Sequence, residues 1–312
     1  MSSPEISVLM LTHNREYLVS RMIEGILNQS FTDFEFLIFD TASTDRSGEI
    51  CEEYAKRDKR IKVWHIDNNS IGSSRNKAVK HAKGRYITFV DDDDMVEKDF
   101  LEFLHNLIVD NDADISICGA CRNTNGNIEP HGMWNDKCVW TPQQSLEEML
   151  LRRRNFQRMP TKLIKRELYQ SIPFKEDCKY EDIWVCYRFM ASAKKVVAYG
   201  IPKYVFYRHS GNNSSFVLTD EWNSERIDEY LKAYRERSIY ISARFPELNN
   251  LCRYSEWSLW MSLCEKISKR RLKSCHKYYE YMLSNLKKDR LDLEKSPWLN
   301  EFDIKRTQTL LL

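Results

Sequence analysis

Short apolar runs alternate with helical patterns over the first 120 residues, and this alternation limits the possible folds more than any other feature. The runs are rich in Ile, Val and Phe and lie at 6–11, 34–39, 61–66, 86–90 and 114–118. Segments with apolar residues at helical spacing, such as 17–28, separate them. Strands that alternate with helices form a mostly parallel sheet with helices on both faces. The sequence therefore predicts an α/β fold.

Polar residues directly follow three of these runs. They are Thr12-His13-Asn14, the segment 40–45 (Asp-Thr-Ala-Ser-Thr-Asp), and four consecutive aspartates at 91–94. In a parallel sheet, ligands bind at the carboxyl ends of the strands. We therefore expect all three polar segments to line one crevice.

The four aspartates have two interpretations. Carboxylates beside one another repel, so a buried run needs water or a cation to neutralise it. Oxygen ligands at a strand end suit Mg²⁺ or Mn²⁺, ions that commonly serve phosphate groups. The alternative is a solvated acidic turn that caps a helix beginning near Glu97, because helix N-termini favour acidic residues.

Charge and cysteine content exclude several classes of protein. The formal net charge is +2, which gives no argument for a nucleic-acid partner. The nine cysteines are scattered and odd in number, so we expect no disulfide framework and a reducing, cytoplasmic location. The sequence shows neither a signal-peptide pattern nor an apolar stretch of about 18 residues, so we expect any membrane contact to be peripheral.

The rest of the chain changes character twice. Residues 123–141 are turn-rich, helical patterns follow at 143–153 and 161–171, and strand-like runs at 196–199 and 204–207 lead to a segment ending in Ser214-Ser215. Beyond about Leu218 glycine is absent and the apolar spacing is helical, with Lys and Arg clustered between 266 and 290. We expect three parts, 1–122, 123–217 and a helical subdomain at 218–312.

Six motifs occur in order along the chain. They are 7–15 (SVLMLTHNR), 26–35 (ILNQSFTDFE), 40–45 (DTASTD), 72–76 (GSSRN), 84–94 (GRYITFVDDDD) and the pair Glu181-Asp182. Together they resemble the inverting glycosyltransferases of family two, which have the GT-A fold, over roughly two thirds of the chain. The resemblance implies that 1–122 binds a nucleotide sugar, and that 123–217 carries the acceptor and catalytic half.

The resemblance also assigns roles to the aspartate run. Asp91, Asp92 and Asp93 occupy the family's DxD position, with Asp93 as the ligand of Mn²⁺ or Mg²⁺ and Asp91 at the ribose, the metal or its water shell. Asp94 is either a further ligand or the cap of the next helix. His209 lies where the family closes a segment over the diphosphate, and it is a candidate metal or phosphate contact.

The nucleotide is expected at the first two strand ends. Thr12 and Asn14 are candidates to bond the base, and Asp40 is expected against the base or ribose, with an Asx turn to Ser43 as its structural alternative. Arg75 is expected beside the diphosphate or base, where a guanidinium forms paired hydrogen bonds that Lys cannot.

Asp182 matches the family's catalytic base, which removes the proton of the acceptor hydroxyl. An acidic pair favoured by the helix dipole is the structural alternative. Glu181 is expected to orient an acceptor hydroxyl or a neighbouring arginine, for which Arg188 is the candidate.

The chain also departs from the family pattern. Leu11 and His13 stand where the family has Pro and Tyr, and Thr41 and Ala42 replace an aspartate and a glycine. The replacements at 41 and 42 change the wall expected to hold the nucleotide, but leave the expected metal and base positions intact.

The expected activity is transfer of a hexosyl or N-acetylhexosaminyl group from a nucleotide sugar, a UDP-sugar by preference, to a glycan or lipid-linked glycan. Synthesis of cell-surface polysaccharide or lipo-oligosaccharide is the expected setting. The basic tail is either a solvated helix face, the default interpretation, or a surface for peripheral attachment to the inner face of the plasma membrane. Two other hypotheses are a different nucleotide-sugar enzyme, disfavoured because 12–16 lacks glycine, and a non-catalytic sugar-binding protein on a degenerate fold.

Overall fold

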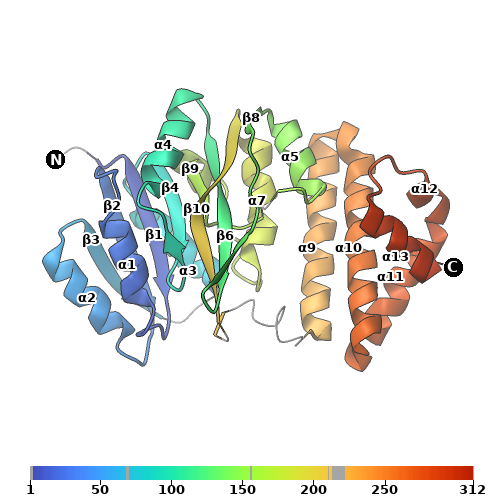
Figure 1. The fold of residues 1–312 in the computed structure, drawn as a ribbon, viewed down its shortest axis with the longest axis horizontal. Coiled ribbons are helices and arrows are strands. Elements are labelled where there is room, and N and C mark those ends of the chain that lie inside the picture. The colour runs from blue at the N-terminus through green and yellow to red at the C-terminus, as the bar shows by residue number, and fades with distance from the viewer. Residues whose placement is uncertain (1–2, 68–69, 155–156, 210, 213–221, 312) are drawn as a thin grey trace. The chain divides into compact units, whose positions relative to one another are not determined.

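A computed structural model describes residues 3–67, 70–154, 157–209, 211–212 and 222–311 (Figure 1). Ser214, Ser215 and the expected boundary between 217 and 218 lie outside these residues. The chain divides into unit 1, Met1–Leu146 with Arg154–Asn212, and unit 2, Glu147–Arg153 with Asn213–Leu312. The division into 1–122, 123–217 and 218–312 stays a prediction.

Unit 1 is built on a sheet. Its strands within the described residues are β1 (Ile6–Thr12), β2 (Phe34–Thr41), β3 (Ile61–Ile66), β4 (Tyr86–Asp91), β5 (Met95–Val96), β6 (Ile115–Thr124), β7 (Asn127–Pro130), β8 (Lys137–Trp140), β9 (Lys162–Lys165) and β10 (Val196–Arg208). The strand order is β3-β2-β1-β4-β9-β6-β10-β5, with β7 beside β6 and β8 beside β10.

Most long strands of this sheet run parallel. β3, β2, β1 and β4 are parallel neighbours, and so are β6 and β10. β9 lies between β4 and β6 and is antiparallel to both. The core strands β1 and β2 are buried almost throughout, as expected when helices cover both faces. The mostly parallel α/β prediction is therefore confirmed.

Helices cover the two faces of the sheet as separate groups. The helices of this part are α1 (Val19–Leu27), α2 (Ser47–Arg57), α3 (Ile71–His81), α4 (Phe100–Asp110), α5 (Pro142–Leu150), α6 (Arg166–Ser171) and α7 (Glu181–Ser192). Residues of α1, α2 and α4 share one apolar core with Val8 and Phe36. On the opposite face, Phe89 contacts Tyr169 of α6, which contacts Phe189 of α7.

One local prediction is wrong in part. Residues 161–171 were expected to be helical, and Arg166–Ser171 do form α6. Lys162–Lys165 instead form β9, because this four-residue run fills the gap between β4 and β6 and is too short for its apolar spacing to identify a helix. Within the turn-rich segment 123–141, β6 and β7 form a hairpin and β8 pairs with β10. Asn125 and Gly126 take φ values of 53° and 89°, the left-handed turn that joins β6 to β7.

Unit 2 is helical in its described residues, which confirms the predicted helical C-terminal region. Its elements after 222 are α9 (Ser224–Arg244), α10 (Asn249–Arg270), α11 (His276–Lys288), α12 (Arg290–Glu294) and α13 (Glu301–Leu311), with short 3₁₀ turns at Pro246–Leu248 and Lys273–Cys275. α10 packs against α9, α11 and α13. Among the described helices of the whole chain, none has both the length and the apolar character needed to span a membrane.

Candidate active site

The three polar strand ends meet at one edge of the sheet. β1 lies between β2 and β4, with Thr12 opposite Asp40 and Leu11 opposite Asp91. The four aspartates follow β4 in a turn in which the amide of Asp94 donates to the carbonyl of Asp91. The register of the strands therefore confirms that the three polar segments converge at one edge of the sheet.

Asp93 receives donors from distant parts of the chain. Its Oδ2 lies 2.9 Å from His209 Nε2, accepts a hydrogen bond of 2.9 Å from Asn212 Nδ2, and lies 3.9 Å from Arg15 Nε. Arg21 donates to its carbonyl and stacks 4.3 Å from the centre of the Tyr207 ring. This carboxylate is therefore fixed toward His209.

Asp92 and Asp94 are buried beside Asp93. Asp92 lies 3.6 Å from Arg15 Nε and accepts from the amide of His13. Asp94 accepts a hydrogen bond of 2.8 Å from the amide of Tyr207 in β10. Because the next helix begins at Phe100, with Asp99 at its N-terminal flank, the interpretation of Asp94 as its cap is wrong.

Repulsion between the aspartates contributes to the raised pKa values of the run. Burial, the Asp93 charge and then Asp91 raise the pKa of Asp92 to about 7, with Thr12 and Arg15 opposing. Burial, Asp93 and Asp182 raise the pKa of Asp91 to about 6, although Arg75 opposes the shift. The Asp91 side chain keeps 42% of its surface exposed, so solvent weakens the effect of these neighbouring charges on Asp91. Burial and its neighbours also raise the pKa of Asp94.

The chemistry of these donors fits a divalent cation. Asp91 and Asp93 offer hard oxygen ligands and His209 offers a nitrogen, a set that suits Mn²⁺ or Mg²⁺. Over the described ranges, no three His, Cys, Asp or Glu side chains are gathered closely enough to hold an ion by themselves. A cation here would therefore take further oxygen ligands from water or from a bound diphosphate.

Asp40 lies at the end of β2 and is almost fully buried. Its Oδ1 accepts from the amide of Ser43, the Asx turn considered above, and its Oδ2 lies 2.8 Å from His65 Nδ1. Gly48 leaves room for this pair, because a Cβ there would lie 2.7 Å from Asp40 Oδ2. Hydrogen bonding to Asp40 raises the pKa of His65.

Asn14 ties the first two strand ends together. Its side-chain Oδ1 accepts a hydrogen bond from the backbone amide of Thr44, and its backbone amide donates to the hydroxyl of Ser43. Thr12 is 1% exposed, and its carbonyl accepts a hydrogen bond from Thr41. Ala42, which replaces the family's glycine, has a φ of 55°, a conformation that costs about 1 kcal/mol in a non-glycine residue.

Arg75 connects the aspartate run to the acidic pair of α7. It is buried between the rings of Phe89 and Phe174, with Nη1 2.8 Å from Glu181 and Nη2 3.7 Å from Asp91. Burial opposes its charge, but Glu181, Asp91 and Asp182 raise the pKa of Arg75 overall. This guanidinium therefore stays charged and bridges two motifs that are distant in sequence.

The Gly-Ser-Ser-Arg-Asn motif holds that bridge in place. A Cβ at Gly72 would lie 2.0 Å from the carbonyl oxygen of Lys175, so only glycine fits. Asn76 exchanges two hydrogen bonds, of 2.9 and 2.8 Å, with the backbone of Phe174. These contacts fasten α3 to the segment that leads into α7.

Asp182 stands in the first turn of α7, beside Glu181. Its Oδ1 accepts a hydrogen bond of 2.8 Å from the amide of Ile183. Burial raises its pKa, although the charges of Arg75, Arg158 and Lys162 oppose the change. The partner of Glu181 is Arg75, whereas Arg188 donates to the hydroxyl of Tyr187.

Sequence reasoning missed several residues of this site. Arg15 and Asn212 contact the aspartates, but no role was predicted for either residue from the sequence. His65, the partner of Asp40, sits in an ordinary strand pattern. Arg158 gave no local signal, because its place depends on the fold between α5 and β9.

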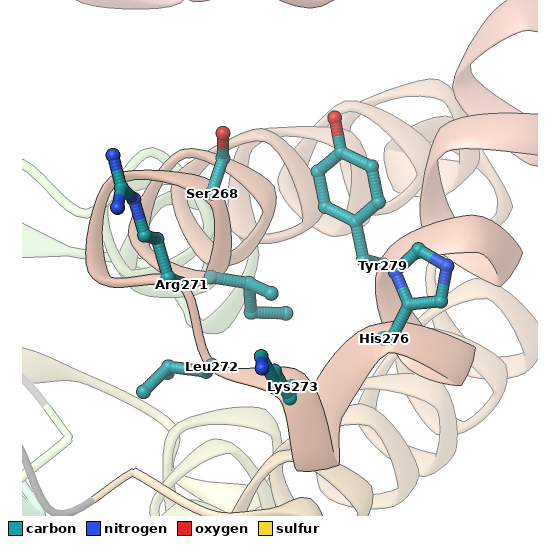
Figure 2. A pocket seen from close by; sticks show the side chains of 7 residues that line it. Ser268, Arg271, Leu272, Lys273, His276 and Tyr279 are labelled. Carbon is teal, nitrogen blue, oxygen red and sulfur yellow. The ribbon is translucent and has the colours of Figure 1, made fainter.

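A hollow of about 470 Å³ lies elsewhere, in unit 2, where α10 ends and α11 begins. It is lined by Ile267, Ser268, Arg271, Leu272, Lys273, His276 and Tyr279. Figure 2 shows the guanidinium of Arg271 and the hydroxyls of Ser268 and Tyr279 pointing to the same side. Among the described residues that line it there is no carboxylate to act as a base. The candidate active site is therefore the edge of the sheet in unit 1 where the three polar segments meet.

Solved structures share this fold. The S. aureus TarS 1–349 structure in complex with UDP-GlcNAc matches with a TM-score of 0.73 and 19% identity, covering 98% of this chain and 90% of that one. Mannosyltransferase PcManGT from Pyrobaculum calidifontis, in complex with GDP-Man and Mn²⁺, matches with a TM-score of 0.60 and 14% identity, covering 91% and 75%. These likenesses confirm the GT-A fold.

Sequence comparison gives the family. The model described as glycosyl transferase family 2 matches residues 7–179. The chain is 30% identical over 239 residues to Glycosyltransferase GlyG of Streptococcus pneumoniae serotype 4 (strain ATCC BAA-334 / TIGR4), covering 73% of this chain and 78% of GlyG. Because the family model spans more than half of the chain, this protein belongs to glycosyltransferase family 2.

Proposed function

We propose that this glycosyltransferase is metal-dependent and inverts the configuration at the transferred carbon, moving a sugar from a nucleotide donor to a hydroxyl of a glycan. One observation carries the proposal. Arg75 contacts both Asp91 of the aspartate run and Glu181 beside Asp182, so the two acidic motifs belong to one site. Such a reaction needs carboxylates that bind a cation and a further carboxylate that accepts a proton.

The proposed donor is a UDP-sugar that carries a hexosyl or N-acetylhexosaminyl group. UDP-GlcNAc is the ligand named for the TarS structure, which supports this choice. We assign the base and ribose to Thr12, Asn14 and Asp40 at the ends of β1 and β2. The hydrogen bonds that Asp40 and Asn14 already make fix the shape of this wall. Arg75, Asp91 and Asp92 complete the proposed donor contacts.

Asp93 is the proposed principal ligand of Mn²⁺ or Mg²⁺, with Asp91 and His209 as further ligands. The Mn²⁺ named for PcManGT supports the choice of metal. When bound, the ion would stabilise the negative charge that grows on the leaving diphosphate. Asn212 Nδ2 donates to the Asp93 carboxylate at 2.9 Å and orients it. His209 Nε2 lies 2.9 Å from the same Asp93 oxygen, and it would have to give up this contact and its proton to bind the ion beside Asp93.

Asp182 is the proposed base. Its carboxylate would accept the proton of the acceptor hydroxyl as that oxygen attacks the sugar from the face opposite the diphosphate. A pKa raised by burial makes this oxygen a stronger proton acceptor than an ordinary aspartate. Glu181, 2.8 Å from Arg75, would hold the start of α7, although burial raises the pKa of its carboxyl to about 7.

The proposed acceptor is a glycan or lipid-linked glycan of a cell-surface polysaccharide or lipo-oligosaccharide, met on the cytoplasmic side of the plasma membrane. Unit 2 offers features for peripheral attachment there. Leu291 and Phe302 expose 70% and 72% of their surface, and the basic side chains Arg271 and Lys273 line the hollow. Sedimentation with phosphatidylglycerol vesicles tests this, and equal binding to neutral phosphatidylcholine vesicles contradicts it.

A donor screen tests the central proposal. Thermal shift would be measured with UDP-, GDP- and dTDP-sugars, each with Mn²⁺ and with EDTA. We expect a shift that requires both the metal and one nucleotide class, and the positive donor would then be tested for transfer. If no nucleotide sugar binds in a metal-dependent way, the proposal fails.

A further inference from the structure

Three arginines gather around one ring at the carboxyl ends of β6 and β10. Arg122 in β6 is the register partner of Phe206 in β10, so their side chains lie on the same face of the sheet. Arg208 follows Phe206 by two residues and projects to that face as well. The guanidinium of Arg158 lies 4.3 Å from the centre of the Phe206 ring.

Two members of this cluster, Arg122 and Arg158, lie close to like charge. Burial and the neighbouring Arg208 lower the pKa of Arg158 to about 10, with Arg122 adding to the shift. Within the described residues neither Arg122 nor Arg158 forms an ion pair, and the buried Nε of Arg122 has no hydrogen-bond partner. By contrast, Arg75 and Arg15 of the same unit contact carboxylates.

The imidazole of His131, which lies beside the arginine cluster, is neutral. Arg122 donates to Nδ1 of His131 at 2.9 Å, and the His131 ring meets Phe206 edge-on. Burial, together with the charges of Arg158, Arg122 and Arg208, lowers the pKa of His131 to about 3. The imidazole is therefore an acceptor at physiological pH and adds no positive charge. Convergent guanidinium groups over an apolar ring and a neutral acceptor suit a bound oxyanion.

The strand order separates this cluster from the expected nucleotide wall. Asp40 lies on β2, on one side of β4, whereas β6 and β10 lie on the other side of β4, beyond β9. Asp182 is near enough to act on the charge of Arg158, as is Asp94. The cluster therefore stands on the side of the crevice where the proposed base would meet the acceptor.

We propose that Arg122, Arg158 and Arg208 form a subsite for a phosphate or carboxylate group carried by the acceptor. The inference rests on the proposed transfer reaction and adds to it a substrate class, an anionic glycan. A donor diphosphate has the same chemistry, so the test must distinguish the two sources.

Calorimetry on the full chain makes this distinction. Glycerol 1-phosphate would be titrated into protein saturated with UDP and Mn²⁺, with uncharged glycerol as the control ligand. We expect the phosphate to bind and glycerol not to bind. Arg122→Gln and Arg158→Gln should each weaken phosphate binding about tenfold, at least fivefold more than they weaken UDP binding.

Two further variants keep the test interpretable. Arg158→Lys retains the charge and should recover most of the affinity, whereas Arg46→Gln, an exposed arginine paired with Glu49, should leave it unchanged. Unfolding temperatures identify variants that fail to fold. Displacement of the phosphate by UDP, or wild-type affinity in both glutamine variants, overturns the subsite. Binding of glycerol phosphate to a protein that ignores UDP would refute the transfer reaction and keep the subsite.

Discussion

Arg75 contacts both the aspartate run and the acidic start of α7, but the protein neutralises the two groups differently. Arg15 lies near both Asp92 and Asp93, and the side chain of Asn212 donates to Asp93. Burial and the crowding of the carboxylates raise the pKa of Asp92 to about 7. At α7, Glu181 has the buried guanidinium of Arg75 at 2.8 Å, and Asp182 accepts from the backbone of its own turn.

This difference separates two chemical tasks. Crowded carboxylates that the protein leaves incompletely paired favour a cation, because a cation relieves several repulsions at once. A carboxylate whose acidic neighbour already has a counter-ion keeps its own oxygen available for a proton. Variants of the two motifs should therefore separate metal binding from proton transfer.

Asp182→Asn is expected to have the largest effect. It should lower transfer by about a thousandfold or more, because an amide cannot accept the proton, and leave metal-dependent nucleotide binding nearly intact. Transfer rates and calorimetry with UDP and Mn²⁺ measure the two properties. Glu49→Gln, at an exposed site of α2, is the control. Full activity of the Asp182 variant would refute its role as the base.

Arg75→Met should destabilise the protein by about 3 kcal/mol or more, because it leaves Glu181 buried without its counter-ion. Urea unfolding measures this loss. The double change Arg75→Met with Glu181→Gln should recover part of it, since position 181 then carries no buried charge. If the double variant were less stable than Arg75→Met, the ion pair would not be the source of the effect.

Asp93→Asn should weaken Mn²⁺-dependent UDP binding roughly a hundredfold, since it removes the proposed principal ligand. Asp94→Asn should have a smaller effect on this affinity, because the Asp94 carboxylate is engaged by the amide of Tyr207. Calorimetry at fixed Mn²⁺ compares the two variants. The opposite order would move the metal assignment to Asp94.

The pH dependence should show the smallest effect. Asp182 acts as a base only when ionised, and burial raises its pKa, so kcat/KM should fall as the pH falls through a value above about 3.9, the ordinary aspartate pKa. A pH profile of transfer measures this acid limb. A limb at or below the ordinary value would mean that burial does not act on the base.

Local patterns in the sequence predicted the meeting point of the strands but not the partners of the side chains. The period of the apolar runs and the place of the aspartates are local properties, and they suffice for the α/β fold and the crevice. Arg75 was expected beside a nucleotide, yet its contact with Glu181 depends on a helix that begins 181 − 75 = 106 residues later. The helical expectation for 161–171 failed in part for a related reason, since pairing with β4 and β6 decides that β9 is a strand.

These long connections have a consequence for synthesis of the protein. The Arg75–Glu181 pair and the Asn212–Asp93 hydrogen bond, which spans 119 residues, each need chain that leaves the ribosome late. A nascent chain that ends before Glu181 has its first four parallel strands but neither the proposed base nor the donors that hold Asp93. On the proposed mechanism, a nascent chain that ends before Glu181 therefore cannot transfer sugar.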